Sequence, residues 1–202
     1  MRMMAVTKTV PLERIVTILQ EKNITLIGES RWQEAKEKLP QLPADIEKHF
    51  IGHLQTNKAA EVTGAFDCIE SVDSVKLAKA INDVANQTKK IMPIFLQVNI
   101  SRDPAKHGFM PEELTEVIPL IQTLPHVRLD GLMTITARAD EDQVRADFRK
   151  MKQLQQQFHL TELSMGMSNG WQIAAAEGAT IVRLGSALFG SRTGARTARL
   201  EL

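Results

Sequence analysis

The 202-residue chain is long enough to bury a substantial core as one large domain or two small ones, and its 43% apolar and 24% charged content is that of an ordinary globular protein. Its 25 basic and 24 acidic residues leave a formal charge of +1, which does not favour a nucleic-acid-binding surface. With one cysteine and no apolar run of signal-peptide or transmembrane length, the sequence predicts a soluble, cytoplasmic protein without an internal disulfide.

Eight short apolar runs typical of β-strands follow one another along the chain. Most of them are continuous, as expected when both faces of a parallel sheet are covered. In chain order, the predicted strands are residues 3–7, 24–28, 48–52, 66–71, 93–99, 128–135, 161–166 and 180–185.

Segments with helical periodicity lie between these runs. The first follows Pro11, a residue that suits the first turn of a helix. Pro119 predicts that the helix within residues 111–124 is short or kinked. The clearest apolar stripes consist of Leu12, Ile15, Val16 and Leu19, of Val75, Ala78, Ile81 and Ala85, and of Val144, Phe148, Met151, Leu154 and Phe158.

This alternation predicts an α/β fold, and eight strand–helix repeats favour a (β/α)₈ TIM barrel. A doubly wound open sheet has the same alternation, and the repeat count alone does not exclude it. We expect a single domain over residues 1–190, followed by a C-terminal tail, 191–202, whose arginines show no clear periodicity.

Polar residues concentrate where the predicted strands end. In a barrel these turns build one end, the mouth, where function resides. Any one such residue is usually an ordinary turn or capping residue, and only their convergence indicates a site. The residues at strand ends are Lys8, Glu29, Ser30, His53, Ser71, Asn99, Ser101, Thr134, Ser164, Met167, Ser168, Arg183, Gly185 and Ser186, with Asn57 shortly after the third strand.

The last two turns carry the strongest local signal. Gly166–Gly170 opens a predicted helix, 171–177, and Gly185 and Ser186 open another short one. Small and hydroxyl residues at helix starts suit a phosphate group, and capping of the two helices by Ser168 and Ser186 is the competing explanation. A lysine amine, Lys8, together with a phosphate site is what pyridoxal 5'-phosphate (PLP) requires.

Two other kinds of site receive less support. Gly166-x-Ser168-x-Gly170 matches the nucleophile elbow of hydrolases, but neither a histidine nor an aspartate follows Ser168 in the chain. No histidine lies in a His-Glu-x-x-His motif. His49 and His53 are four residues apart, a spacing that would suit a helix, but Phe50-Ile51 between them is predicted to be strand. We therefore predict neither a hydrolase triad nor a metal site.

Arg183 lies on an otherwise apolar strand, on the same side as Gly185, and a buried charge requires a partner. It is either one half of a structural ion pair or a donor to the pyridine nitrogen of PLP. In the second case it would keep that nitrogen unprotonated and weaken the ring as an electron sink.

Many motifs, in order from Ala5 to Arg192, resemble one family, the YggS/PROSC-type PLP homeostasis proteins. The matching segments are Ala5-Val6-Thr7-Lys8, Gly28-Glu29-Ser30-Arg31-Trp32-Gln33-Glu34, residues 49–58, Ser71-Val72-Asp73, Gln97-Val98-Asn99, Lys106-His107-Gly108-Phe109, Gly131-Leu132-Met133-Thr134, residues 163–168, Val182-Arg183-Leu184-Gly185-Ser186 and Phe189-Gly190.

The resemblance implies the barrel of the alanine racemase N-terminal domain, PLP as the cofactor, and a cytoplasmic role in vitamin B6 homeostasis without established catalysis. It implies that Lys8 forms an internal aldimine, that Ser168, Gly185 and Ser186 hold the phosphate, and that Arg183 faces the pyridine nitrogen. The full predicted cofactor-binding set is Lys8, His53, Asn57, Met133, Ser164, Met167, Ser168, Arg183, Gly185 and Ser186.

Three departures from the family pattern stand out. The family carries a helix before its first strand, whereas this chain starts almost at that strand, so we expect a barrel that lacks the N-terminal helix. The family usually has asparagine where this chain has Ser30, and aspartate where it has Gly170. Neither change removes Lys8 or the two phosphate turns.

Three functional classes follow from these residues. The first is a PLP-binding protein, with PLP-requiring apoenzymes as expected partners and a monomer or weak homodimer as the expected state. The second is a small PLP-dependent amino-acid racemase, which is disfavoured because alanine racemase pairs its lysine with a tyrosine and this chain contains no tyrosine. The third is a barrel that binds another phosphorylated metabolite.

Overall fold

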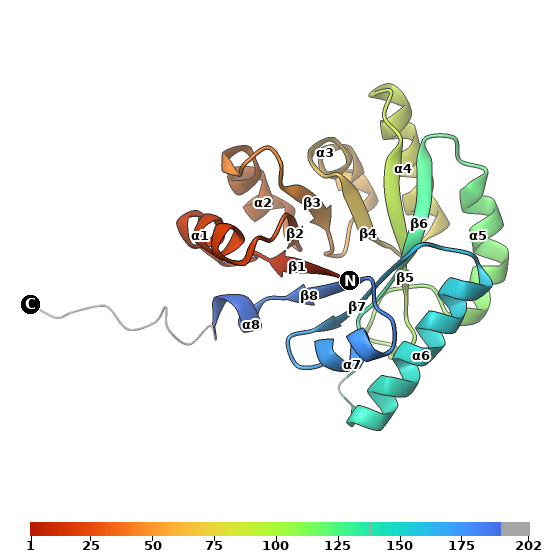
Figure 1. Ribbon diagram of the computed structural model, residues 1–202. Coiled ribbons are helices and arrows are strands. Elements are labelled where there is room, and N and C mark those ends of the chain that lie inside the picture. Colours follow the sequence, from red (N-terminus) through yellow and green to blue (C-terminus); the bar gives the residue numbers. More distant parts are fainter. Residues whose placement is uncertain (138, 191–202) are drawn as a thin grey trace, which may run out of the picture.

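Eight parallel strands close into a barrel in which each strand pairs with its neighbours in chain order and β1 pairs with β8 (Figure 1). The computed structural model describes residues 1–137 and 139–190. The strands are β1 (Arg2–Val6), β2 (Leu26–Glu29), β3 (Glu47–Phe50), β4 (Cys68–Val72), β5 (Met92–Val98), β6 (Val127–Thr134), β7 (Glu162–Met167) and β8 (Ile181–Leu184). All eight predicted strands are confirmed, with ends that shift by one or two residues.

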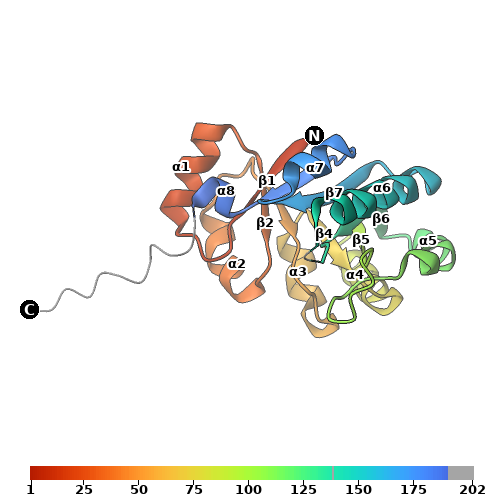
Figure 2. The same ribbon diagram turned by 90° about the horizontal axis from the view of Figure 1, so that it is seen from below.

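Helices connect the strands and surround the barrel, as Figure 2 shows from a second direction. The α-helices are α1 (Leu12–Lys22), α2 (Trp32–Lys38), α3 (Ala59–Ala65), α4 (Val75–Gln87), α5 (Leu114–Gln122), α6 (Glu141–Gln157), α7 (Trp171–Ala176) and α8 (Ser186–Phe189). Three short 3-10 helices complete the described elements: η1 (Leu39–Gln41), η2 (Thr56–Lys58) and η3 (Pro111–Glu113).

Closure of the sheet decides between the two architectures that the sequence left open. Strand β1 pairs with β8 over four residue pairs, from Arg2 with Ile181 to Ala5 with Leu184. An open doubly wound sheet has no such pairing between its first and last strands. The (β/α)₈ barrel is therefore confirmed, and β1 is the first element of the chain.

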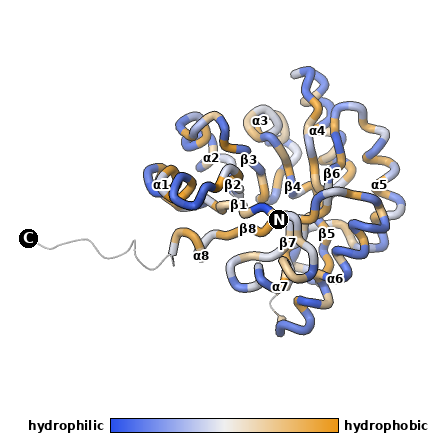
Figure 3. The backbone as a smooth tube through the Cα atoms, in the orientation of Figure 1, coloured by the Kyte–Doolittle hydropathy of each residue, from blue (hydrophilic) through white to orange (hydrophobic). Residues whose placement is uncertain are grey.

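The amphipathic stripes of the sequence face the strands. Helix α1 buries Ile15 and Leu19, and α4 buries Ala78, Ile81 and Ala85 in the same way. Hydropathy along the chain follows this layering, with apolar segments in the central strands and polar ones on the outer helix faces (Figure 3). Burial of these stripes supplies the main driving force for packing the helices onto the barrel.

The helix around Pro119 is short, as predicted. Helix α5 covers nine residues and is preceded by the 3-10 turn η3. Pro11 lies one position earlier than expected, at the N-cap of α1.

The buried apolar residues form two clusters. The larger one lies between the strands and the surrounding helices. The smaller one fills the interior of the barrel and consists of Met4, Leu26, Ile51, Cys68, Phe95, Met133 and Ile181. A TIM barrel interior filled by side chains is a packed core, so any ligand site lies at one end of the barrel and not along its axis.

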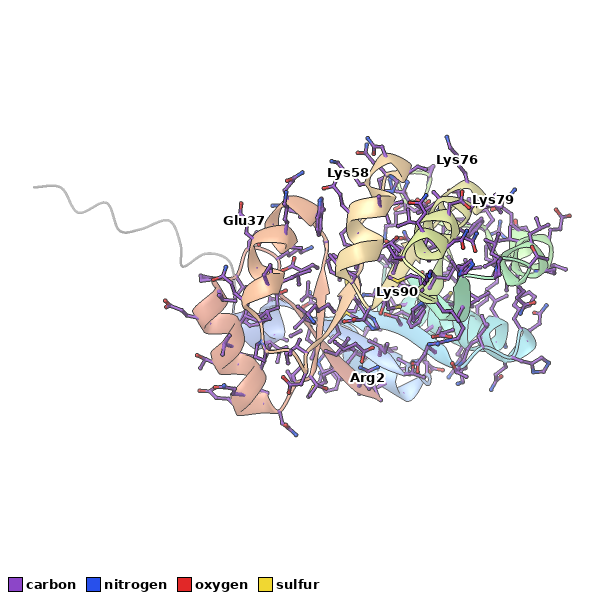
Figure 4. The ribbon with its side chains drawn as sticks, turned by 90° about the horizontal axis from the view of Figure 1, so that it is seen from above. Arg2, Glu37, Lys58, Lys76, Lys79 and Lys90 are labelled. Atoms are coloured by element: carbon purple, nitrogen blue, oxygen red, sulfur yellow. The ribbon has the colours of Figure 1, made fainter. Side chains whose placement is uncertain are left out.

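The two ends of the barrel differ in the segments that form them. Figure 4 shows Lys58 of η2 and Lys76 of α4 along one edge of the molecule, where the βα turns lie, and Arg2 near the opposite edge. Trp32 and Trp171 are the first residues of α2 and α7, each directly after a βα turn. Both tryptophans of the chain therefore lie where a helix begins, next to the turns that form the mouth.

In the part of the chain that the structure describes, no helix combines the length and apolar character needed to cross a membrane. The predicted tail, 191–202, lies outside the described residues.

Candidate functional site

A cavity of about 370 Å³ opens among the turns that follow the strands, and Lys8 lies in its wall. Its wall comes from the turns after β1, β2, β3, β5 and β6. The lining residues are Lys8, Thr9, Ser30, Arg31, Ile51, Gly52, His53, Gln97, Ala105, Lys106, His107 and Ile135. The structure thus brings two predicted site residues, Lys8 and His53, into one cavity at the mouth.

The residue before Lys8 is fixed by buried polar contacts. The hydroxyl of Thr7 donates to Glu29 Oε1 at 2.6 Å, and the Lys38 ammonium donates to the Thr7 carbonyl at 2.9 Å. The same ammonium lies 3.5 Å from Glu29 Oε1. Burial raises the pKa of Glu29, while the hydrogen bond from Thr7 and the charge of Lys38 act against this rise.

The residue after Lys8 is fixed as well. Thr9 adopts a left-handed backbone conformation with φ of 63°, which is uncommon for a residue other than glycine. Its amide donates to the Glu34 carboxylate, and this carboxylate also pairs with Lys38. Because both of its neighbours are anchored, the backbone of Lys8 holds a defined position at the rim of the barrel.

Lys8 and Lys106 are both lysines of this cavity, but their amines differ in what they contact. The Lys106 ammonium donates to the carbonyls of Ile135, at 3.1 Å, and Thr136. Within residues 1–137 and 139–190, the Lys8 amine has neither a hydrogen bond nor an ion pair. The amine that is available to a ligand in this cavity is therefore that of Lys8.

Arg183 is fully buried inside the barrel, close to the mouth. It donates to Ser164 Oγ at 2.7 Å and to the Thr134 carbonyl at 2.6 Å. Burial lowers its pKa, and the negative charge of Glu70 opposes this effect. Three strand-end residues that the sequence singled out, on β6, β7 and β8, thus meet in one hydrogen-bonded group.

His49, in β3, is buried as well. Its Nδ1 is 2.7 Å from Glu70 Oε1 and its Nε2 is 2.6 Å from Glu47 Oε1. Burial alone would lower the pKa of His49, but the hydrogen bonds with Glu47 and Glu70 raise it to about 9. The hydrogen bond with His49 lowers the pKa of Glu47 to about 2. His49 is therefore a structural cation and does not pair with His53.

The two turns predicted to bind phosphate adjoin each other. Ser168 Oγ accepts hydrogen bonds from the amides of Gly185, at 3.3 Å, and Ala187, at 3.4 Å. Ser168 therefore contacts the start of α8 and does not cap α7, whose N-cap is Gly170; Gly185 is the N-cap of α8. The explanation that Ser168 and Ser186 each cap their own helix is wrong, because the turn after β7 reaches across to β8.

Gly185 connects these turns with the strand that leads to Lys8. A Cβ atom at Gly185 would lie 3.8 Å from the Cβ of Val6, the last residue of β1. The last turn of the barrel and the turn that carries Lys8 are thus direct neighbours. Ser168, Gly185 and Ser186 are not among the residues that line the Lys8 cavity.

Three other predicted site residues lie apart from the cavity. Met133 is buried in the barrel interior, and Met167 is exposed at the end of β7. Asn57 is exposed in η2. Their assignment to the cofactor site stays a prediction.

Two histidines and an aspartate form a cluster in the neighbouring loops that no sequence motif indicates. His53 Nδ1 lies 3.2 Å from Asp73 Oδ2, and His107 Nδ1 lies 3.7 Å from the same atom. The two imidazole rings are stacked, with centroids 3.9 Å apart and planes at 12°. These residues are 20 and 34 positions apart in the chain, so only the order of the strands around the barrel could have suggested the cluster.

The chain matches one family model over nearly its whole length. The model describes the alanine racemase N-terminal domain and covers residues 1–193. The match includes all eight strands and the turns at the mouth.

Curated relatives match the chain over nearly its full length. The pyridoxal phosphate homeostasis protein of Pasteurella multocida is 36% identical over 202 residues, which cover 95% of this chain and 86% of the relative. The protein of the same name from Aquifex aeolicus is 37% identical over 199 residues, which cover 95% and 87%.

A solved structure agrees with the fold at a similar level of identity. PipY of Synechococcus elongatus, solved with PLP bound, is 36% identical and superposes with a TM-score of 0.83. The similarity covers 94% of this chain and 92% of that one. The structure of PipY without PLP gives a TM-score of 0.87.

Proposed function

This chain belongs to the family of the pyridoxal phosphate homeostasis proteins, which share the alanine racemase N-terminal domain, and from that premise we propose that it binds PLP and serves in vitamin B6 homeostasis. The observation that carries the proposal is the Lys8 amine, which lies in the mouth cavity without a partner among the described residues. PipY, the relative solved with PLP bound, supports it.

The chemistry of the site fits the cofactor. PLP, when bound, supplies an aldehyde that condenses reversibly with a primary amine, and a phosphate that requires several hydrogen-bond donors. Lys8 provides the amine, and we propose that it is the residue linked as a Schiff base. The fixed positions of Thr7 and Thr9 orient this amine at the rim of the barrel.

Donors for a phosphate come from the last two turns. The amides of Gly185 and Ala187 are joined to the Ser168 hydroxyl at 3.3 and 3.4 Å, and the exposed Ser186 adds a second hydroxyl. Backbone amides at the start of a helix bind anions well. We propose that a bound phosphate accepts the hydrogen bonds that the amides of Gly185 and Ala187 donate to Ser168 Oγ in this structure. Arg183, held by Ser164, would lie on the side of the ring nitrogen.

A binding role fits this chain better than an enzymatic one. The curated relatives carry the name of a homeostasis protein and not that of an enzyme. A two-base racemase needs a second proton carrier opposite the lysine, and this chain contains no tyrosine. The proposal extends to a cytoplasmic location, supported by the single, unpaired Cys68, and to PLP-requiring apoenzymes as partners.

Borohydride trapping tests the role of Lys8. The full chain is mixed with PLP, reduced with borohydride, digested and mapped by mass spectrometry. We expect a reduced adduct on the peptide that contains Lys8. In Lys8→Ala we expect loss of the adduct and affinity for PLP that falls by at least about tenfold, or about 1.4 kcal/mol.

Lys79→Ala is the matched control. Lys79 is an exposed lysine on the outer face of α4 (Figure 4), so this variant should trap PLP as the wild type does. An adduct on Lys106, or equal trapping in Lys8→Ala, would contradict the assignment. Turnover of an added amino acid by the PLP-loaded wild type would favour a racemase. If the wild type failed to bind PLP but bound another phosphorylated metabolite tightly, the barrel would be a binding protein for that metabolite.

A further inference from the structure

Three side chains that commonly bind metal ions meet at the rim of the mouth. They come from three consecutive turns: His53 follows β3, Asp73 follows β4 and His107 follows β5. Their potential ligand atoms all lie within 4.8 Å of one another. Adjacent strands of the closed barrel bring these turns together, although the chain separates them.

The spacing of the ligand atoms is close to that of a bound metal ion. Asp73 Oδ2 lies 3.2 Å from His53 Nδ1 and 3.7 Å from His107 Nδ1. Tetrahedral coordination with metal–ligand bonds near 2.0 Å separates neighbouring ligand atoms by about 3.3 Å. The two stacked imidazoles, whose planes now meet at 12°, would have to rotate out of parallel so that a ring nitrogen of each points at the same ion.

The turns that carry the two histidines are well anchored. Gln97 Nε2 donates to the His107 carbonyl at 2.9 Å. Before His53, the backbone at Gly52 packs against Ser30 so closely that a Cβ atom would lie 2.0 Å from the Ser30 carbonyl oxygen. Two fixed backbones favour a preformed site, because less chain entropy is lost when a ligand binds.

The surroundings of the cluster suit a cation. The side chains of His53 and His107 are 46% and 58% exposed, whereas that of Asp73 is 13% exposed and lies beneath them. Among the described residues, the ion pairs of Asp73 are with these two histidines. The nearby Lys106 ammonium is bound by the carbonyls of Ile135 and Thr136 and does not neutralise this carboxylate.

We propose that His53, Asp73 and His107 form a binding site for one divalent transition-metal ion, with Zn²⁺ the best match. Two imidazoles and one carboxylate form a donor set that suits Zn²⁺ and similar ions, and they leave at least one coordination position open. His53 and His107 also line the Lys8 cavity, so the ion would lie at its edge. The metal site does not require Lys8 or a Schiff base, although it shares the edge of the Lys8 cavity.

Metal titration of the full chain, kept free of PLP, tests this inference. We expect calorimetry to show one Zn²⁺ per chain. Co²⁺ should give visible absorption bands that shift with its coordination, and added Zn²⁺ should displace them. His107→Gln and Asp73→Asn should each weaken Zn²⁺ binding by at least about tenfold, since even loss of a residue that only supports a ligand weakens metal sites by 10–100-fold.

The control is His159→Asn. His159 is an exposed histidine in the turn before β7, and its left-handed backbone (φ of 53°) tolerates asparagine. This variant should bind Zn²⁺ as the wild type does, and circular dichroism should show that all variants are folded. No stoichiometric Zn²⁺ binding by the wild type, or unchanged affinity in a folded His53→Gln/His107→Gln double variant, would overturn the proposal. The second result would mean that the three side chains only share hydrogen bonds.

Discussion

His49 links the stability of this barrel to pH through a single buried side chain. It is 2% exposed and lies between the carboxylates of Glu47 and Glu70. These contacts raise its pKa from 6.5 to about 9. A group whose pKa is higher in the folded state stabilises the fold fully below its unfolded value, near 6.5. This stabilisation is lost as the pH rises through about 9.

We predict that His49→Gln removes this dependence on pH. The free energy of unfolding of the wild type should fall between pH 6.5 and pH 9 by on the order of 3 kcal/mol more than that of the variant. Urea unfolding at several pH values measures the difference. His126→Gln, which changes a histidine outside this cluster, should keep the wild-type slope, and a His49→Gln profile parallel to the wild type would contradict the prediction.

The turn between β3 and η2 depends on the absence of a side chain at Gly52. A Cβ atom there would lie 2.0 Å from the Ser30 carbonyl oxygen, an overlap that only backbone movement can relieve. The turn after β2 contains Ser30 and the turn after β3 carries His53, so both would have to move apart. Both residues line the Lys8 cavity, and packing of the two turns thus controls its shape.

Gly52→Ala and Gly64→Ala form a matched pair of substitutions. Gly64 lies in α3, and no atom lies within 4 Å of the position that a Cβ atom would take there, so alanine should stabilise the protein by about 0.5–1 kcal/mol. Gly52→Ala should instead destabilise it by about 1–3 kcal/mol through overpacking, and should weaken PLP binding. Thermal and urea unfolding compare the two. Equal effects would show that the contact with Ser30 does not constrain the turn.

Closure of the barrel joins the two ends of the described chain. Ala5 in β1 pairs with Ile27 of β2 on one side and with Leu184 of β8 on the other. In β1 the backbone groups on both sides are therefore used, and no edge strand remains in the barrel. Loss of this strand would expose two edges at once.

We predict that Ala5→Pro lowers the stability of the whole barrel. Proline removes a backbone donor from a central strand and leaves a buried carbonyl without its partner, which should cost about 1–3 kcal/mol. Far-UV circular dichroism should show one unfolding transition at a lower urea concentration. Loss of only part of the signal, with the remainder unfolding at the wild-type midpoint, would show that the other strands fold without the β1–β8 pairing.

The sequence predicted the elements better than their lateral contacts. Continuous apolar runs specify strands locally, and all eight strands were found. Closure of the barrel depends on pairing between β1 and β8, such as that of Ala5 with Leu184, and the number of repeats does not reveal this pairing. Lys8 was found because it follows an apolar strand. Glu29 and Lys38, which fix the preceding Thr7, were missed as a group, since they come from β2 and α2 and meet only after the barrel has formed.

The two tryptophans make intrinsic fluorescence a probe of the mouth of the barrel. With no tyrosine in the chain, nearly all of its ultraviolet emission comes from two indoles. Trp32 begins α2 and Trp171 begins α7, on either side of the paired strands β1 and β8. A variant with one indole replaced by phenylalanine keeps a single emitter of known location. A chromophore bound at the mouth would quench the fluorescence of the nearer indole more strongly. Comparison of quenching in the two variants would therefore show which side of the mouth it occupies, without any added label.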